Sequence, residues 1–377
     1  MRIGVPKEIK NEERRVSLTP GGAAELAGRG HEVLVERGCG SGAGFADEEY
    51  TAHGSLVADS AEEVFEWAEM IVKVKEPQAE ERALLGEGQV LFTYLHLAAD
   101  AIQTAELMER GVTAIAYESV VGPNGGLPLL APMSQVAGRM SIQAGAHCLE
   151  SSAGGRGVLL GGVPGVAPAK VAIIGGGVVG RNAVQMAIGL GADVTVIDRD
   201  VSVLEDLSSR YGSALHTLHS SGGALEEAVL GADLVIGAVL IRGARAPRLV
   251  TAEMVEMMRP RSAVVDVAID QGGCIETSLP TTHAKPTYLA FDVVHYCVAN
   301  MPGAVPRTST FALENATLPY MANLADQGPM EALRSDAGLR AGLSVCRGQI
   351  TEPAVAESLG LDHTAPEQVL GRGRRAA

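Results

Sequence analysis

Residues 170–198 read KVAIIGGGVVGRNAVQMAIGLGADVTVID, and this stretch predicts the fold around which the chain is built. Val171–Ile174 is a short apolar run, typical of a buried strand. Apolar residues at helical spacing follow from Arg181 to Leu190. Ala192–Ile197 is a second buried strand, and it ends at Asp198. The stretch is therefore a strand–helix–strand unit with a glycine-rich first connection.

That connection places Gly175, Gly177 and Gly180 in the spacing G-x-G-x-x-G. In a dinucleotide-binding fold the first glycine permits a tight turn, the second lets the backbone approach a pyrophosphate, and the third lets helix and strand pack closely. Asp198 is placed to accept hydrogen bonds from the adenine ribose. Its carboxylate would repel a 2′-phosphate, so the stretch predicts NAD as cofactor, with Arg199 beside it as the one opposing feature. A glycine-rich turn without a ligand is the alternative.

Composition narrows the class of protein. A length of 377 residues suggests two to three domains. Only 3% of the residues are aromatic whereas 46 are glycines, a mixture that favours aliphatic sheets with glycine-rich turns over a β-sandwich. The formal net charge of −15 argues against nucleic acid as a partner, because phosphates demand a basic surface.

The sequence also predicts a reduced, cytoplasmic protein. No apolar segment follows a basic N-terminal start, so no signal peptide is expected. The most apolar region, Gly157–Gly180, is interrupted by Pro164, Pro168 and Lys170 and is not expected to span a membrane. The five cysteines are dispersed without a C-x-x-C pair, which predicts free thiols and no metal site.

We expect an α/β protein with two doubly wound Rossmann-like domains, a cleft between them, and a discontinuous first domain. Strands and helices alternate from Arg2 to Ala116, which predicts a parallel sheet. Turn-rich joints then suggest a catalytic domain formed by residues 1–128 and 307–377 and an NAD-binding domain formed by residues 129–306. The segment from Thr308 is expected to be largely helical and to fold back onto the first sheet.

Local signals predict where several helices begin and where order ends. Thr19 before Pro20 is a typical N-cap, because Pro is favoured at the first helical position. Ser60 and Asp100 are placed to cap two further helices. Gly371–Ala377 is expected to be a loose tail.

Three polar residues follow buried strands, at the edge of a parallel sheet where ligands bind. They are Lys75 after residues 70–74, His96 after residues 90–93 and Asp270 after residues 263–267. A cation, an imidazole and a carboxylate beside a nicotinamide ring would make a hydride-transfer site. Each residue also has an ordinary structural interpretation: a solvated loop lysine, a structural histidine, and an aspartate that fixes its own turn.

Four other residues are candidates for binding. Arg14 and Arg15 follow a run of acidic residues, so they belong either to a salt-bridged surface loop or to a grip on a substrate carboxylate. Ser134 lies near the start of a long helix, where it could cap the helix or donate to the cofactor. Asn300 follows an apolar strand and could reach the nicotinamide side of the predicted cleft.

Beyond these patterns, the chain resembles the alanine dehydrogenase family from Arg2 to about Thr351. The segments that carry the resemblance keep the family's order and spacing, and they are GVPKEIKNEERRVSLTPGG, IVKVKEP, VLFTYLHLAAD, PMSQVAGRM, GVAPAKVAIIGGGVVGRNA, VVDVAIDQGGCIET and HYCVANMPGAVPRTST.

The resemblance implies reversible oxidative deamination of L-alanine by NAD to pyruvate and ammonium, in a homohexamer. It implies that Arg15 and Lys75 bind the substrate carboxylate, that Lys75 and His96 take part in catalysis with His96 as acid and base, and that Asp270 orients a water molecule. The cofactor residues it implies are Ser134, Gly175, Gly177, Val178, Val179, Gly180, Asp198 and Asn300.

Some features leave alternatives open. Many members of the family carry Arg or Lys near the adenosine, a few residues after the aspartate that ends the second strand, whereas residues 199–203 here read RDVSV, which bears on the choice between NAD and NADP. Ser17 stands where a smaller Ala or Gly is usual. The α-subunit of proton-translocating transhydrogenase has a similar plan, but its relatives lack the YLHLA context around His96. A saccharopine-type dehydrogenase would accept a larger substrate. A non-catalytic NAD-binding protein would be expected to lack at least one of the four implied catalytic and substrate-binding residues, and all four are present.

Overall fold

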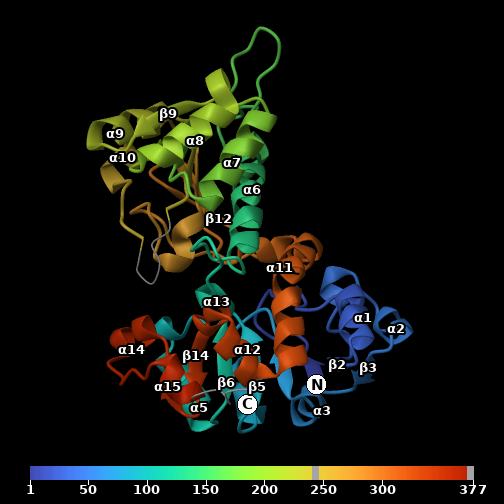
Figure 1. Ribbon diagram of the computed structural model, residues 1–377. Coiled ribbons are helices and arrows are strands. Elements are labelled where there is room, and N and C mark those ends of the chain that lie inside the picture. The colour runs from blue at the N-terminus through green and yellow to red at the C-terminus, as the bar shows by residue number, and fades with distance from the viewer. Residues whose placement is uncertain (240–245, 372–377) are drawn as a thin grey trace. The chain divides into compact units, whose positions relative to one another are not determined.

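The chain folds into two α/β units, described in a computed structural model over residues 1–239 and 246–371 (Figure 1). Unit 1 comprises Met1–Pro132 and Val305–Ala377, and unit 2 comprises Met133–Ala304. Both units have the strand order of a doubly wound Rossmann-like sheet, which confirms the predicted fold class. The tail predicted beyond Gly371 lies outside the described residues. Among the described residues, no helix combines the length and apolar character that a membrane span needs.

Unit 1 is built on an eight-stranded sheet in the order β15-β14-β6-β5-β4-β1-β2-β3. The first six strands in sequence pair in parallel, and β14 and β15 extend one edge antiparallel. The strands are β1 (Arg2–Val5), β2 (Glu32–Glu36), β3 (Leu56–Ala58), β4 (Met70–Val72), β5 (Val90–Thr93), β6 (Thr113–Ala116), β14 (Leu343–Cys346) and β15 (Gln349–Ile350).

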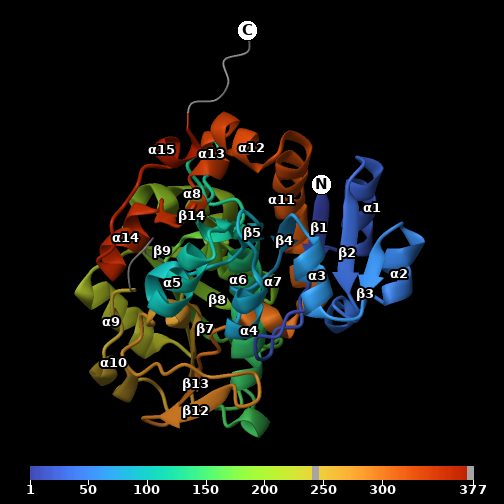
Figure 2. The same ribbon diagram turned by 90° about the horizontal axis from the view of Figure 1, so that it is seen from below.

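Helices cover this sheet, and their starts follow the predicted caps. The side chains of Thr19, Ser60 and Asp100 each accept a hydrogen bond from a backbone N–H in the first turn of the following helix. Figure 2 shows α1 and α2 beside β2 and β3 at one edge. The helices are α1 (Pro20–Gly28), α2 (Asp47–Ala52), α3 (Ala61–Trp67), α4 (Ala79–Leu84), α5 (Ala101–Glu109), α11 (Pro306–Gln327), α12 (Pro329–Ser335), α13 (Ala337–Arg340), α14 (Pro353–Leu359) and α15 (Pro366–Leu370).

The C-terminal segment differs from the expectation in one respect. It folds back onto the first sheet as predicted, but it also adds β14 and β15 to that sheet. The short strands β3 in unit 1 and β9 (His216–His219) in unit 2 also went unpredicted. β9 carries two histidines and pairs only with β8 at the sheet edge, so it lacks the apolar run that marks a buried strand.

Unit 2 is built on a seven-stranded sheet in the order β12-β13-β11-β10-β7-β8-β9, with only β12 antiparallel. Its remaining strands are β7 (Lys170–Ile174), β8 (Asp193–Asp198), β10 (Leu234–Gly237), β11 (Ala263–Asp266), β12 (Thr287–Ala290) and β13 (Val293–Tyr296). Its helices are α6 (Ala131–Cys148), which begins two residues before the unit, α7 (Val178–Gly189), α8 (Val201–Tyr211), α9 (Gly222–Gly231) and α10 (Ala252–Glu256).

Each sheet contains one point where the direction of winding reverses. In unit 1 this point lies between the neighbouring strands β1 and β4, and in unit 2 between β7 and β10. The connections that leave the two strands at such a point run to opposite sides and leave a crevice at the carboxyl ends, where ligands bind. The topology therefore places one candidate ligand site in each unit.

A buried ion cluster lies at the carboxyl ends of β1 and β4. Lys73 is fully buried, with its Nζ 2.6 Å from Glu81 Oε1 and 3.2 Å from Glu8 Oε2. Burial lowers the pKa of Lys73, but the two carboxylates outweigh it and the pKa is raised. Glu8 Oε1 also accepts a hydrogen bond from Val74 N at 2.6 Å. The cluster joins the loop after β1 to the loop after β4.

We predict that Lys73→Met destabilises unit 1 strongly. The substitution leaves Glu8 and Glu81 buried without a cation, a change that costs about 3–5 kcal/mol when one partner of a buried pair is removed. The measurement is the free energy of unfolding in urea. Arg37→Met is the matched control, because Arg37 pairs with Asp59 at the surface and should cost less than about 1 kcal/mol. Equal effects of the two substitutions would contradict the prediction.

Candidate functional site

The carboxyl edge of the unit 1 sheet brings together three of the predicted site residues. Lys75 follows β4, His96 follows β5, and Arg15 lies in the long connection between β1 and α1. The charge of Arg15 lowers the pKa of Lys75, and the charge of Lys75 lowers that of His96, so the three groups lie within electrostatic reach of one another. The strand-end rule thus identified two groups, Lys75 and His96, that lie close to one another in unit 1, and their role in binding or catalysis stays a prediction.

Arg15 is buried rather than part of a solvated loop. Only 2% of its side chain is exposed, and its Nε donates to Glu13 Oε1 at 2.6 Å while Nη2 donates to Glu13 Oε2. Burial lowers the pKa of Arg15, but Glu13 more than offsets this effect and the guanidinium stays charged. Arg14 beside it is exposed. Arg14 therefore fits the surface interpretation, whereas Arg15 does not, and a grip of Arg15 on a substrate carboxylate stays a prediction.

A cavity of about 400 Å³ opens beside this arginine pair, between the connections that follow β1 and β2. It is lined by Lys7, Glu8, Glu13, Arg14, Arg15, Gly38, Cys39, Ser41 and Gly42. Cations and carboxylates alternate around it, as suits a small polar ligand better than an apolar one.

Ser17 ties the Arg15 connection to β4. Its hydroxyl donates to the carbonyl of Val72, the last residue of that strand, at 2.8 Å. Lys75 lies three residues further on, and its main-chain N–H donates to Glu8 Oε1 at 3.4 Å. A smaller residue at position 17 would lack the hydroxyl bond, so Ser17 adds one fixed link between the two groups predicted to bind the substrate carboxylate.

Lys75 differs from its neighbour Lys73. Burial lowers the pKa of Lys75, and the nearby charge of Arg15 lowers it further, against a smaller opposing effect of Glu76. Lys75 therefore holds its proton less firmly than an ordinary lysine. Such a group can bind a carboxylate as a cation and also exchange a proton with a bound substrate.

Glu76 links His96 to the N-terminal loop. Glu76 Oε1 accepts from the ammonium of Lys10, and Glu76 Oε2 lies 3.8 Å from His96 Nδ1. Burial raises the pKa of Glu76, but His96, Lys75 and Lys10 together lower it to about 2. The carboxylate is therefore charged at neutral pH. Its position against Nδ1 leaves Nε2 as the nitrogen available to a substrate.

The main chain of His96 adopts a left-handed conformation, with φ 54° and ψ 36°. Its N–H donates to Glu118 Oε1 at 2.6 Å. Burial lowers the pKa of His96, but the charge of Glu118 and the contact with Glu76 raise it above its usual value. The imidazole is half-exposed within unit 1. It thus combines access with a tuned pKa, as an acid–base residue requires.

In unit 2 the three glycines of the motif differ in their surroundings. Gly175 has φ 99°, a conformation that a side chain would strain. A Cβ on Gly180 would lie 1.8 Å from the carbonyl oxygen of Gly175, so only glycine allows α7 to pack on β7. A Cβ on Gly177 would meet no atom of residues 1–239 or 246–371 within 4 Å. The space above Gly177 is therefore open to a ligand, as the motif predicts.

The first turn of α7 completes this phosphate-binding geometry. The helix begins at Val178, three residues earlier than predicted from the apolar spacing, and Gly177 supplies no side-chain cap. The first N–H groups of α7 can therefore bind an anion. Asp198 at the end of β8 accepts from Gly176 N at 2.6 Å and from Asp200 N at 2.8 Å. Its carboxylate is fixed beside the glycine loop, where the sequence predicts the ribose.

Ser134 does not cap α6. The helix begins at Ala131, so Ser134 lies within its first turns and the capping interpretation is wrong. A Cβ on Gly138, one turn later, would lie 2.2 Å from the carbonyl of Val179, which shows that α6 packs against the start of α7. Ser134 as a donor to the cofactor stays a prediction.

Asp270 and Asn300 follow the adjacent strands β11 and β13. Asp270 is exposed on a short 3-10 helix, Val267–Gln271, and the buried Asp266 holds this turn by accepting from the N–H groups of Ala268 and Ile275 at 3.2 and 3.1 Å. The carbonyl of Asn300 lies 2.8 Å from His283 Nε2. Both candidates thus sit on turns fixed by other side chains.

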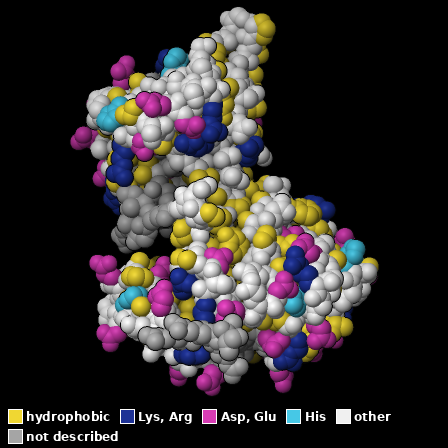
Figure 3. Space-filling model, viewed as in Figure 1, with side chains coloured by type: hydrophobic (Ala, Val, Ile, Leu, Met, Phe, Trp, Pro, Cys, Tyr) yellow, Lys and Arg dark blue, Asp and Glu magenta, His cyan; other side chains and the backbone are white. Residues whose placement is uncertain are grey.

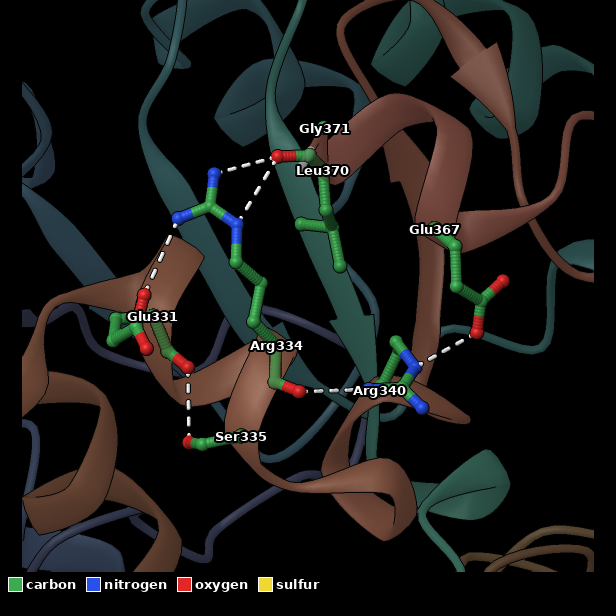
Figure 4. Close-up of a pocket in the computed structure, with 7 residues that line it drawn as sticks. All are labelled: Glu331, Arg334, Ser335, Arg340, Glu367, Leu370 and Gly371. Atoms are coloured by element: carbon green, nitrogen blue, oxygen red, sulfur yellow. Dashed lines mark hydrogen bonds and ion pairs between the residues drawn. The ribbon is translucent and has the colours of Figure 1, made fainter. Parts of the chain in front are cut away.

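A further cavity, of about 240 Å³, lies among the C-terminal helices (Figure 4). Arg334 donates through Nε and Nη2 to the carbonyl of Leu370, and Arg340 donates to Glu367 at 3.0 Å. These arginines join α12 and α13 to α15. The cavity contains none of the predicted site residues, and its charged groups serve helix packing.

Sequence reasoning missed the acidic residues that hold the site. Glu8, Glu13, Glu76 and Glu118 were not among the predicted site residues. Glu118 lies two residues after β6, so the strand-end rule applied to that strand would have found it. The pairing of the others depends on long-range contacts that no local pattern encodes.

Models of known families agree with this geometry. The model described as alanine dehydrogenase/PNT, N-terminal domain, matches residues 4–137, and the corresponding C-terminal domain matches residues 141–353. The chain belongs to the alanine dehydrogenase/PNT family. The predicted resemblance is confirmed over nearly the whole chain.

Curated members of the alanine dehydrogenase/PNT family are similar at full length. The chain is 58% identical over 371 residues to an alanine dehydrogenase of Halomonas elongata, which covers 98% of this chain and 100% of that protein. It is 54% identical over 371 residues to one of Bacillus subtilis, covering 98% of each. A solved structure of an L-alanine dehydrogenase has a TM-score of 0.93 at 54% identity and covers 96% of this chain and 99% of that one.

A transhydrogenase from Sinorhizobium meliloti also shares the fold. Its TM-score is 0.80 at 24% identity, with 94% of this chain and 100% of that one covered. At this identity the likeness concerns the arrangement of strands and helices alone.

We predict that Gly177→Ala weakens NADH binding while the fold is kept. The added methyl group meets no atom of the part of the chain that the structure describes, but it would occupy the space through which a pyrophosphate approaches the backbone. A rise in the dissociation constant of about tenfold, worth about 1.4 kcal/mol, is expected in a fluorescence titration. Gly189→Ala at the far end of α7 is the control and should leave binding unchanged. Unaltered affinity in Gly177→Ala would argue against the assigned loop.

Proposed function

We propose that the protein catalyses the reversible oxidation of L-alanine with NAD and water to pyruvate, ammonium and NADH. The observation that carries the proposal is full-length identity above 50% to curated alanine dehydrogenases, together with a cationic site at the carboxyl edge of unit 1. The class of reaction is oxidation of an amino acid at its CH–NH₂ carbon. Unit 1 is the proposed substrate domain and unit 2 the proposed NAD domain.

The residues of unit 2 fit a dinucleotide. The open space at Gly177, the uncapped start of α7 and the fixed Asp198 carboxylate supply a phosphate cradle and a ribose acceptor. Further contacts are proposed from Gly175, Val178, Val179, Gly180, Ser134 and Asn300. When bound, NAD supplies the acceptor for the hydride that leaves the alanine Cα.

Arg15 and Lys75 are proposed to bind the alanine carboxylate. Glu13 holds the Arg15 guanidinium in one orientation, and Glu8 holds the main chain of Lys75. Two cations on fixed supports can orient the substrate before hydride transfer, and such positioning can contribute on the order of 7–11 kcal/mol in favourable cases.

His96 and Asp270 are proposed to manage protons. After hydride loss, water must add to the iminium carbon and ammonia must leave. His96 can accept the proton from water through Nε2 and return it to the departing nitrogen, because Glu76 faces Nδ1. Asp270 is proposed to orient the water and to favour the cationic intermediate.

Two further properties are proposed. The loop between α6 and β7 projects beyond the helices of unit 2 in Figure 1 and exposes Leu159, Val163 and Val166 at 65%, 53% and 62%. Apolar side chains so exposed favour burial between subunits, in support of self-association, and the homohexamer is proposed from the family resemblance. The five cysteines are free and buried, in support of a reducing cytoplasm.

On the face drawn in Figure 3, acidic and basic side chains are interspersed, and no nucleic acid partner is proposed.

We predict that the wild-type chain reduces NAD with L-alanine and that His96→Ala lowers kcat by about 10²–10⁴. The measurement is NADH absorbance with a panel of amino acids. NADH binding, followed by fluorescence, should survive the substitution because the dinucleotide residues lie in unit 2. Full activity in His96→Ala would contradict the role of His96, and turnover of lysine or glutamate in preference to alanine would favour a related dehydrogenase.

We predict a preference for NAD that depends on Asp198. A carboxylate beside a 2′-phosphate is repelled, and such like-charge contacts cost several kcal/mol. Asp198→Asn should therefore raise kcat/KM for NADP relative to NAD by at least about tenfold, or about 1.4 kcal/mol. Asp206→Asn is the control, since that partly exposed carboxylate on α8 pairs with Arg181 and Arg210. An unchanged ratio in Asp198→Asn would contradict the ribose assignment.

A further inference from the structure

We propose that Glu118 is a positioning residue for His96, and that its carboxylate fixes the main-chain turn from which the imidazole projects. The inference rests on the proposed function, in which His96 exchanges protons with the substrate. Glu118 acts through the main chain, whereas Glu76 faces the ring itself.

The carboxylate of Glu118 holds two consecutive N–H groups. It lies on a single 3-10 turn, Tyr117–Ser119, directly after β6, which is the parallel neighbour of β5. His96 N donates to Oε1 at 2.6 Å, and Leu95 N donates to Oε1 and Oε2 at 3.1 and 3.3 Å. The carbonyl of Leu95 accepts from Gln103 Nε2 at 2.7 Å. The peptide between Leu95 and His96 is therefore held on both sides.

The turn needs such support because His96 is left-handed. A residue with a Cβ adopts φ 54° only at a cost, and it persists where surrounding contacts determine it. Hydrogen bonds to a charged acceptor are stronger than neutral ones. The left-handed residue ends the extended course of β5 and opens the 3-10 helix Leu97–Ala99, so the direction of the imidazole depends on this conformation.

Glu118 also contributes charge at the imidazole. Within unit 1 the charged groups near His96 are Glu118 after β6 and Lys75 and Glu76 after β4, with Lys10 of the N-terminal loop paired to Glu76. Burial lowers the pKa of His96, the charge of Glu118 is the largest effect that raises it, and the net direction is upward. Removal of the Glu118 charge should therefore shift loss of the His96 proton to lower pH.

Two variants separate the hydrogen bonds that Glu118 accepts from the main chain from the effect of its charge on the imidazole. Glu118→Gln keeps an amide oxygen that can accept from both N–H groups but removes the charge. Glu118→Ala removes both. The matched control is Glu352→Gln, because Glu352 is also a partly buried carboxylate close to this turn, yet it accepts from Ser119 and Ser344 and not from the His96 turn.

The experiment measures kcat with alanine against pH, and the rate at which diethyl pyrocarbonate modifies His96, followed by peptide mass spectrometry. Only the neutral imidazole reacts with this reagent, so the rate reports its protonation without any turnover. We expect Glu118→Ala to lower kcat about 10- to 100-fold with NADH affinity kept. Glu118→Gln should recover most of that loss, and both its modification curve and the acid limb of its pH profile should move to lower pH.

An unchanged modification curve in Glu118→Gln, an undiminished kcat in Glu118→Ala, or an equal shift in Glu352→Gln would each overturn the proposal. If the wild-type chain fails to oxidise alanine, the proposed function is wrong. The modification curves of His96 need no turnover, so the curves of the wild type, the two Glu118 variants and Glu352→Gln still decide whether Glu118 acts on this histidine.

Discussion

The hydrogen bonds and the ion pair made by the Glu8 carboxylate hold together the carboxyl edge of the unit 1 sheet, where Arg15 and Lys75 lie. This carboxylate lies where the winding of the sheet reverses, between β1 and β4, and it accepts from the main-chain N–H groups of Val74 and Lys75 while it pairs with Lys73. A crevice at such a point would otherwise leave these N–H groups unsatisfied, at a cost comparable to lost hydrogen bonds. One buried side chain thus joins the connection that carries Arg15 to the strand end that carries Lys75.

This arrangement gives two nearby lysines opposite properties. Lys73 is enclosed by two carboxylates, its pKa is raised, and it acts as a fixed structural cation. The pKa of Lys75 is lowered because burial and the nearby charge of Arg15 both disfavour its cationic form, and the opposing effect of Glu76 is smaller. Composition and spacing treat the two alike. The difference arises because only the folded sheet determines which of them faces Glu8 and Glu81 and which faces the site.

The predictable features were those encoded by neighbours in sequence. The glycine motif, the caps at Thr19 and Asp100 and the strand-end positions of Lys75 and His96 each rest on a few adjacent residues. The hydrogen bond from the His96 N–H to Glu118 joins residues that are 22 positions apart and that meet only because β5 and β6 pair. No local pattern reports such pairing. Strand β9 went unpredicted for a related reason, since its one partner strand, not its own polar sequence, makes it extended.

The two units solve recognition differently on the same topology. In unit 2 the connection at the reversal point is a few residues long and rich in glycine, so a ligand bound there as proposed would meet main-chain N–H groups and a helix terminus. In unit 1 the equivalent connection spans residues 6–19, and it brings charged side chains instead. A pyrophosphate is large and can be bound by backbone dipoles alone. An amino acid is small and carries a carboxylate, which the paired Arg15 and the partly buried Lys75 are proposed to bind, and the ion clusters at this edge suit that proposed role.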